Sequence, residues 1–389
     1  MLLTARRIFT GRTSDVLDDH MLEIDGGRIV DIRRRGSAAP GADVVDLGDA
    51  TLLPGLIDTH VHLAFDAGLD AVAALATRDD DAVLEAMAEA AAAQLRAGVT
   101  TVRDLGDRDY LALRLRESRT GLPTIVAAGP PITSAGGHCH FLGGVAERGV
   151  RDAVREHAER GVDVIKVMAS GGGMTPESDV QKPQFTPDDL AALVDEAHRH
   201  GLPVTAHAHA LEAIVDGVAA GVDGLEHCTF IDGDRVHAPD EVVEAIVRRR
   251  IAVGATVGLV PVEGGFRPPP FLATIMPDLM ANLARLIREG AVIVAGTDAG
   301  IAPIKPHGVL PHGLLHFVQL GMSPVEALTA GTSTAAQVCG LGDRKGRVRP
   351  GYDADLLAVD GDPTTDIGAL LRPVTVLVAG RPVVTAAVS

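Results

Sequence analysis

The stretch Leu56-Ile57-Asp58-Thr59-His60-Val61-His62-Leu63 decides the fold, because it joins a short apolar run to a pair of histidines. Side chains two residues apart in a β-strand point to the same face, so a strand here places both imidazoles on one side. Two histidines on one face close to an aspartate are typical metal ligands. An isolated His-x-His pair also occurs by chance, so its meaning depends on what the other strands carry.

The middle of the chain repeats this kind of strand. Helical patterns and glycine- or proline-containing turns separate most of the runs, and Thr186-Pro187 and Ser323-Pro324 have the residues of helix starts. Parallel strands need such crossover helices, and eight strands are the number that closes a barrel. We therefore predict an α/β fold with a (β/α)8 barrel over residues 54–345. The seven further strands are Thr100–Leu105, Thr124–Ala128, Val162–Met168, Pro203–His209, Gly224–Thr229, Ile251–Ala255 and Ala291–Thr297, and the helices between them include Asp81–Arg96, Thr186–His200 and Leu211–Ala220.

The two ends of the chain have a different pattern, in which apolar and polar residues alternate around tight turns. Asp25-Gly26 and Ala379-Gly380 are hairpin signals between such segments. Neither end is long enough to bury a core by itself. We therefore expect residues 1–53 and 346–389 to form one small β-sandwich domain; two independent caps are the alternative.

The composition excludes several classes of partner. The formal net charge is −17, and a nucleic acid or an anionic membrane surface would require a basic surface that the chain lacks. Three cysteines without C-x-x-C spacing favour a reducing compartment, and Met1–Thr10 has no apolar core of a signal peptide. We expect a soluble, cytoplasmic homo-oligomer that acts on a small molecule or a short peptide.

Four further strands end in residues that bind metals or move protons. Lys166 stands alone in an apolar strand, where an unpaired ammonium is costly to bury; reaction with carbon dioxide would turn it into a carboxylate that can bridge two cations. His207 and His209 lie two residues apart, His227 follows Glu226, and Asp298 stands between Gly296 and Gly300 at the end of the last strand. Because the carboxyl ends of barrel strands form the catalytic face, the full set predicts one metal site.

Three segments carry a resemblance to a known family. Pro54-Gly55-Leu56-Ile57-Asp58-Thr59-His60-Val61-His62 resembles the opening signature of the amidohydrolase superfamily, and Gly351-Tyr352-Asp353-Ala354-Asp355-Leu356 resembles a returning strand of its small β domain. Ile165-Lys166-Val167-Met168-Ala169-Ser170-Gly171-Gly172 is similar to the imidazolonepropionase-like group, which includes metal-dependent dipeptidases and prolidases. The resemblance covers nearly the whole chain and does not specify the substrate.

The resemblance implies a binuclear centre with two divalent ions, expected to be zinc. His60 and His62 would hold the more buried ion, and His207 and His227 the more exposed one. Carbamylated Lys166 would bridge them. Asp298 would bind the buried ion and carry the proton from the bridging hydroxide to the leaving nitrogen. The implied reaction is hydrolysis of an amide in a peptide-like compound, an N-acyl amino acid or a cyclic amide.

Other histidines are weaker candidates for substrate contacts. His140 lies in the run His138-Cys139-His140 and could reach a substrate carbonyl or carboxylate. His209 could be a substrate or supporting group, although dipeptidase relatives often have tyrosine near this place. His307 and His312 follow the last strand of the barrel, in what we expect to be a loop.

Three other functions stay open. A mononuclear deaminase would use a glutamate three residues after the histidine of the fifth strand, and Glu212 has that spacing from His209, although we expect it to start the next helix. A cyclodehydratase would run the amide reaction in the biosynthetic direction. A non-catalytic binding barrel would be expected to lose some of the six ligand positions, and all six are present.

Overall fold

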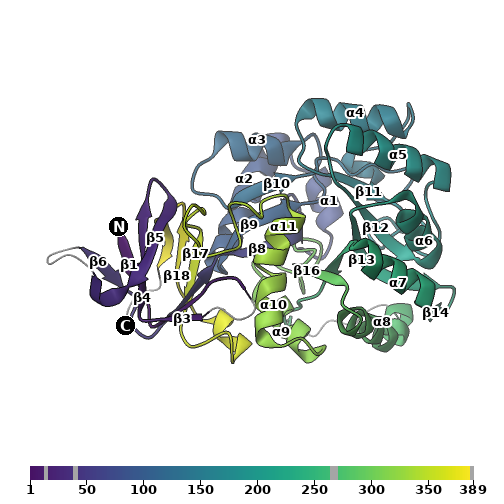
Figure 1. Cartoon of the computed structure of the whole chain (residues 1–389). Helices are drawn as coiled ribbons and strands as arrows, with labels where there is room; N and C mark the ends of the chain where they lie inside the picture. The colour runs from purple at the N-terminus through teal and green to yellow at the C-terminus, as the bar shows by residue number, and fades with distance from the viewer. Residues whose placement is uncertain (13–15, 38–42, 263–269, 386–389) are drawn as a thin grey trace.

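The computed structural model describes residues 1–12, 16–37, 43–262 and 270–385. Strands from the two ends of the chain lie together at one side of the molecule, and the helices and strands of the middle of the chain form the rest (Figure 1). The larger hydrophobic core belongs mainly to the middle of the chain, and the smaller one to the terminal strands. Within these ranges, no helix is both long and apolar enough to cross a membrane.

Eight strands in the middle of the chain run parallel to their neighbours. They pair in the orders β10-β9-β8 and β11-β12-β13-β15-β16. The eight strand positions predicted from the sequence are confirmed, with shifts only at their ends. The strands are β8 (Leu56–Val61), β9 (Val99–Asp104), β10 (Thr124–Ala127), β11 (Ile165–Met168), β12 (Val204–Ala210), β13 (Gly224–Asp232), β15 (Ala252–Thr256) and β16 (Val292–Gly296).

Two isolated bridges link the edges of these sheets. Val61 bridges to Ala299 beyond β16, and Ile132 beyond β10 bridges to Val167 of β11, both in parallel orientation. Each of the eight strands therefore has a neighbour on both sides. Because the strands are parallel, their carboxyl ends meet at one rim, which is where the predicted site residues lie.

The burial of the strands explains their apolar sequence. Every residue of β8, β9 and β11 is buried, as expected for parallel strands covered on both faces. The charged residues inside these strands are therefore exceptions that need partners. Arg103 of β9 and Lys166 of β11 are such residues, and Glu226 of β13 is a third charged residue in the same situation; all three are almost fully buried.

Helices follow most of the parallel strands. Thr186 caps α5, because its hydroxyl accepts from the Asp189 amide at 3.2 Å, and Ser323 and Glu326 form a capping box at α10. Both helix starts predicted from the sequence are confirmed. The helices are α1 (Ala71–Ala76), α2 (Asp80–Arg96), α3 (Leu111–Ser118), α4 (Val150–Arg160), α5 (Pro187–Arg199), α6 (Leu211–Ala220), α7 (Asp240–Arg249), α8 (Pro270–Arg288), α9 (Leu310–Gln319), α10 (Pro324–Ala330) and α11 (Ser333–Val338).

The terminal strands form two further sheets. One has the order β5-β4-β1-β6, and the other, β19-β18-β17-β7-β2-β3, interleaves strands from both ends of the chain. Apolar residues of both sheets share one core, so the two ends fold together rather than as separate caps. The strands are β1 (Leu2–Thr4), β2 (Arg7–Phe9), β3 (Val16–Asp18), β4 (His20–Asp25), β5 (Arg28–Arg34), β6 (Val44–Asp46), β7 (Thr51–Pro54), β17 (Leu356–Val359), β18 (Pro373–Val378) and β19 (Arg381–Thr385).

The two predicted hairpins meet at their tips. Gly26 and Gly27 join β4 to β5, and Ala379 and Gly380 join β18 to β19, all four with positive φ as the tight hairpin turns require. A Cβ on Gly27 would lie 3.2 Å from the Cβ of Ala379, so the tips are in close contact. Pro54, which the sequence assigned to the barrel, is the last residue of β7; the exact domain limits stay a prediction.

Candidate metal centre

Three predicted ligands meet at the carboxyl ends of β8 and β16. The Nε2 atom of His62 lies 3.2 Å from Oδ1 of Asp298, and Nε2 of His60 lies 3.5 Å from the same oxygen. All three side chains are buried. We call His60, His62 and Asp298 the inner group.

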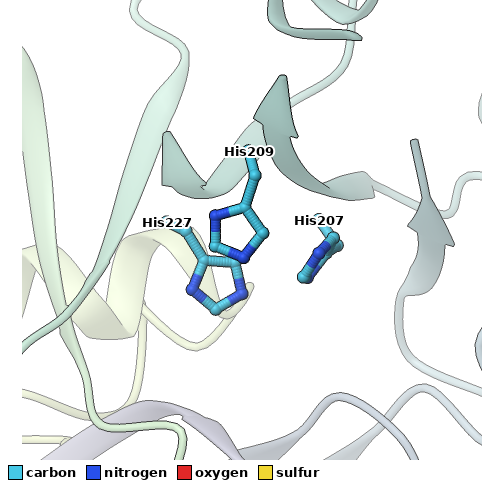
Figure 2. Close-up of side chains that lie close together, drawn as sticks. All are labelled: His207, His209 and His227. Carbon is cyan, nitrogen blue, oxygen red and sulfur yellow. The ribbon is translucent and has the colours of Figure 1, made fainter. Parts of the chain in front are cut away.

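Three histidines of β12 and β13 gather beside them (Figure 2). The ring centroids of His207, His209 and His227 lie 4.6–4.7 Å from one another, and one nitrogen of each ring lies within 4.8 Å of the others. We call these three residues the outer group. His227 also belongs to a second set of converging ligand atoms with His60 and Asp298, so the two groups share an edge.

Two of these residues have an unusual backbone. His227 and Asp298 have φ of 66° and 60°, in the left-handed region that non-glycine residues rarely adopt. In β12 the pairing register with β13 shifts between Ala208 and Ala210, next to His209. Such backbone strain persists only where the surroundings enforce it, and it is concentrated at functional sites.

Hydrogen bonds fix which nitrogen of several rings carries a proton. Nδ1 of His60 lies 2.8 Å from Oε2 of Glu226, and Nδ1 of His62 lies 3.0 Å from the Gly106 carbonyl oxygen. Nε2 of His207 lies 3.2 Å from the carbonyl oxygen of Gly171. Because carbonyls and carboxylates only accept, these nitrogens donate, and the opposite nitrogens of the neutral His60 and His207 rings keep a free lone pair. This is the arrangement that supports histidine ligands of a metal. The opposite nitrogen of His62 faces the Asp298 carboxylate.

Four of the five histidines of the two groups are in the neutral form that metals bind. The fifth is His62: burial opposes its charged form, but the hydrogen bond to Asp298 and the charge of that carboxylate raise the pKa of His62. Burial lowers the pKa of His60 and of His209 to about 4, and it lowers the pKa of His207 and His227 well below the usual range. Four neutral rings are therefore available at pH 7. The chemistry of this donor set fits divalent cations that accept imidazole nitrogen.

Lys166 lies in β11 with its side chain almost fully buried, and among the described residues its Nζ has no hydrogen-bond partner. Burial lowers its pKa to about 8, although Glu226 and Asp298 act in the opposite direction. An unpartnered buried amine is costly, so it signals a missing partner or a modification. A carbamate would remove the positive charge and add oxygen donors at this place.

A buried carboxylate that the sequence analysis did not single out supports the inner group. Glu226 accepts hydrogen bonds from Arg103 Nη2 at 2.9 Å, from Thr205 Oγ1 at 2.6 Å and from His60 Nδ1 at 2.8 Å. Burial alone would raise its pKa, but Arg103 and His60 hold the pKa of Glu226 below its usual range. A Cβ on Gly254 would lie 2.0 Å from Oε2 of Glu226, so the neighbouring strand needs glycine there. The signal in the sequence was Arg103, a cation within the predicted strand Thr100–Leu105, where a buried guanidinium needs a partner.

The structure separates the two histidines of the run after β10. His140 is exposed, and its Nδ1 lies 3.0 Å from the Gly137 carbonyl oxygen. His138 is buried instead, its ring centroid is 4.6 Å from that of His207, and its Nδ1 has no partner among the described residues. His138 is therefore the ring that joins the cluster, while a substrate contact by His140 stays a prediction.

Residues after β16 hold the surrounding loops. His307 Nε2 lies 2.8 Å from the Phe65 carbonyl oxygen, so this nitrogen donates to the loop after β8. Lys305, which the sequence analysis also missed, donates to the carbonyl oxygens at the ends of β15 and β16, with distances of 2.9 and 2.7 Å. The expectation that His312 lies in a loop is wrong, because α9 begins at Leu310 with proline in its first turn.

The glutamate that the mononuclear deaminase alternative requires does not lie at the metal centre. Glu212 lies in the first turn of α6 and is exposed, so it faces solvent rather than the buried cluster. A proton-transfer group must lie within hydrogen-bond reach of the reacting atoms.

Comparisons with known proteins agree with this architecture. The model of the amidohydrolase family matches residues 51–383. Ochratoxinase of Aspergillus niger is 29% identical over 371 residues, which cover 83% of this chain and 72% of that protein. A Xaa-Pro dipeptidase structure with bound methionine has a TM-score of 0.85 at 27% identity and covers 98% of both chains. A prolidase in complex with N-methylphosphonate-L-proline has a TM-score of 0.86 at 27% identity and covers 99% of both chains. These likenesses show the fold of a TIM barrel with an added β-sandwich.

Proposed function

Because the chain belongs to the amidohydrolase family of metal-dependent C–N hydrolases, we propose that it cleaves the amide bond of a dipeptide or an N-acyl amino acid. Xaa-Pro dipeptidase and prolidase among the similar structures favour a dipeptide-like substrate. The convergence of the inner and outer groups at His227 supports a centre with two metal ions.

The residues present would divide this centre between them. His60, His62 and Asp298 would hold one zinc ion, and His207 and His227 the other. A carbamate on Lys166 would lie between the ions, which is consistent with the buried, unpartnered Nζ of this residue. When bound, the ions would lower the pKa of water and withdraw electrons from the scissile carbonyl.

Asp298 is the residue suited to move the proton. Burial alone would raise its pKa, but His60 and His62 hold the pKa of Asp298 well below its usual range, so the carboxylate is ionised and able to accept. It would take a proton from the attacking water and return it to the amide nitrogen. An amine leaves poorly unless it is protonated, so both transfers serve the same bond cleavage.

The test is metal content followed by a substrate screen. Purified protein should contain about two divalent ions per chain, and exhaustive chelation should abolish hydrolysis until zinc is restored. The screen compares Xaa-Pro dipeptides, other dipeptides, N-acyl amino acids and cyclic amides, each followed by release of the amine. Full activity after chelation, or no bound metal in active protein, would contradict the proposal.

A further inference from the structure

His209 is the member of the outer group to which the proposed function gives no role. Its ring centroid lies 4.6 Å from those of both His207 and His227, and it is nearly parallel to the His227 ring, with an angle of 21° between the ring planes. Figure 2 shows the three labelled rings gathered together. The further inference rests on the proposed metal-dependent function and concerns the coordination of the outer ion.

The hydroxyl of Thr229 determines which ring nitrogen of the neutral His209 carries the hydrogen. Thr229 Oγ1 donates to the backbone carbonyl oxygen of His209 at 3.1 Å, and it lies 3.0 Å from Nδ1 of the same residue. A hydroxyl has a single proton, so once that proton is given to the carbonyl the oxygen can only accept from Nδ1. Nδ1 therefore carries the hydrogen of the neutral ring, and Nε2 carries a free lone pair.

A free lone pair on Nε2 limits what His209 can do. A substrate carbonyl or carboxylate needs a donor, and an unprotonated Nε2 is an acceptor. A cation needs such a lone pair. The orientation that Thr229 enforces therefore favours a metal ligand over the substrate contact that the sequence suggested for His209.

The backbone around the outer group holds these rings in place. The amide of His209 donates to Ser170 Oγ at 2.9 Å, and Nε2 of His207 lies 3.2 Å from the carbonyl oxygen of Gly171. The residues after β11 thus fix both histidines of β12. Two nitrogens bonded to one tetrahedral ion at about 2.1 Å lie about 3.4 Å apart. One nitrogen of each ring lies within 4.8 Å of the others, so the rings would approach one another by up to about 1.4 Å when they share an ion.

We infer that His209 supplies a third imidazole to the outer ion, so that His207, His209 and His227 form a three-histidine site. The inner group has two imidazoles and a carboxylate, so the two sites differ in donor type. Imidazole suits zinc, copper, nickel and iron, whereas carboxylate and water suit magnesium and manganese. The outer site should therefore discriminate more strongly against magnesium and manganese than the inner site does.

The test compares His209→Ala and Thr229→Val with His237→Ala, a control at an exposed histidine of the same barrel. Chelator-stripped proteins are titrated with zinc in competition with a chromophoric chelator, and with cobalt(II), whose visible absorption reports the ligand set. Changing a group that only orients a ligand costs about 10–100-fold in metal affinity. We therefore expect about that loss for one of the two ions in Thr229→Val, and a larger loss with a changed cobalt spectrum in His209→Ala.

Two sets of outcomes separate this inference from the proposed function. If His209→Ala binds two ions with parental affinity and an unchanged cobalt spectrum, His209 is not a ligand of the outer ion and the inference is overturned. Metal-dependent hydrolysis by the parent protein would then leave the proposed function intact. Parental metal affinity in Thr229→Val would equally contradict the role of Thr229 in orienting His209. If His209→Ala fails to fold, Thr229→Val still tests the inference, because it replaces only a hydroxyl with a methyl group. A parent protein that binds no metal would contradict the proposed function itself.

Discussion

Replacing Glu226 with glutamine should damage both the stability and the metal affinity of the protein. Glu226 is 1% exposed, and its two oxygens accept hydrogen bonds from Arg103 and Thr205 on one side and from His60 on the other. Glutamine has nearly the same shape, so the change tests charge and hydrogen bonding rather than packing. Whichever way the amide is turned, its NH₂ group faces a donor.

The size of the effect follows from these contacts. The guanidinium of Arg103 is almost fully buried, and its other described bond, from Nε to the Thr59 carbonyl oxygen at 2.7 Å, does not neutralise its charge. Removing one partner of a buried ion pair costs about 3–5 kcal/mol, because an uncompensated charge is left behind. His60 also loses a charged acceptor for Nδ1–H, and such changes around a metal ligand cost about 10–100-fold in affinity.

The assay is urea denaturation of the metal-free proteins together with a competitive zinc titration of each. Glu244→Gln, at an exposed glutamate of α7, is the matched control and should change neither quantity. A loss below about 1 kcal/mol in Glu226→Gln, with parental zinc affinity, would refute the reasoning. It would mean that Arg103 finds another counter-charge and that the orientation of His60 does not depend on Glu226.

Three further predictions concern catalysis, the bridging group and acid stability. Asp298→Asn should retain the fold and much of the metal while turnover falls by at least about 10²–10⁴-fold, because asparagine cannot accept the proton; near-parental hydrolysis with metals bound would exclude the proton transfer. Lys166→Ala should lose most activity and recover part of it in added acetate, as measured by initial rates, whereas parental activity without acetate would exclude a bridging carbamate. The Arg155 and Arg151 guanidiniums hold the pKa of Glu196 at about 2, below its ordinary value of 4.5. The ionised carboxylate therefore stabilises the fold fully above pH 4.5, and this stabilisation is lost as the pH falls towards 2. The difference in free energy of unfolding between the parent and Glu196→Gln should shrink across that window, and a constant difference would contradict this ion pairing.

The expectation for the run His138-Cys139-His140 shows where sequence reasoning stops. In β12 the spacing of two residues brings His207 and His209 together, because side chains alternate along an extended strand. The same spacing does not hold after β10, since Cys139 has φ of 57° and the chain turns. His138 is consequently buried against His207, while His140 points to solvent.

The sequence by itself determined the features that depend on residues close together in the chain. The strand positions follow from short apolar runs, the caps of α5 and α10 from residues three apart, and the hairpin tips from the turn residues Asp25-Gly26 and Ala379-Gly380. His60 and His62 lie on the same face because side chains alternate along an extended strand. These preferences are properties of the backbone and its nearest side chains, so they can be read before the chain is folded.

Only the tertiary structure decided which of these residues meet. Arg103, Glu226 and His60 come from β9, β13 and β8, and nothing in the spacing of 123 residues between the first two predicts their contact. The partner of Thr229 is likewise chosen by the pairing of β12 with β13. A charged residue in a strand that will be buried indicates that a partner is needed, because an unpaired charge in a low-dielectric interior is costly. The order and register of the strands around the barrel decide which partner it finds.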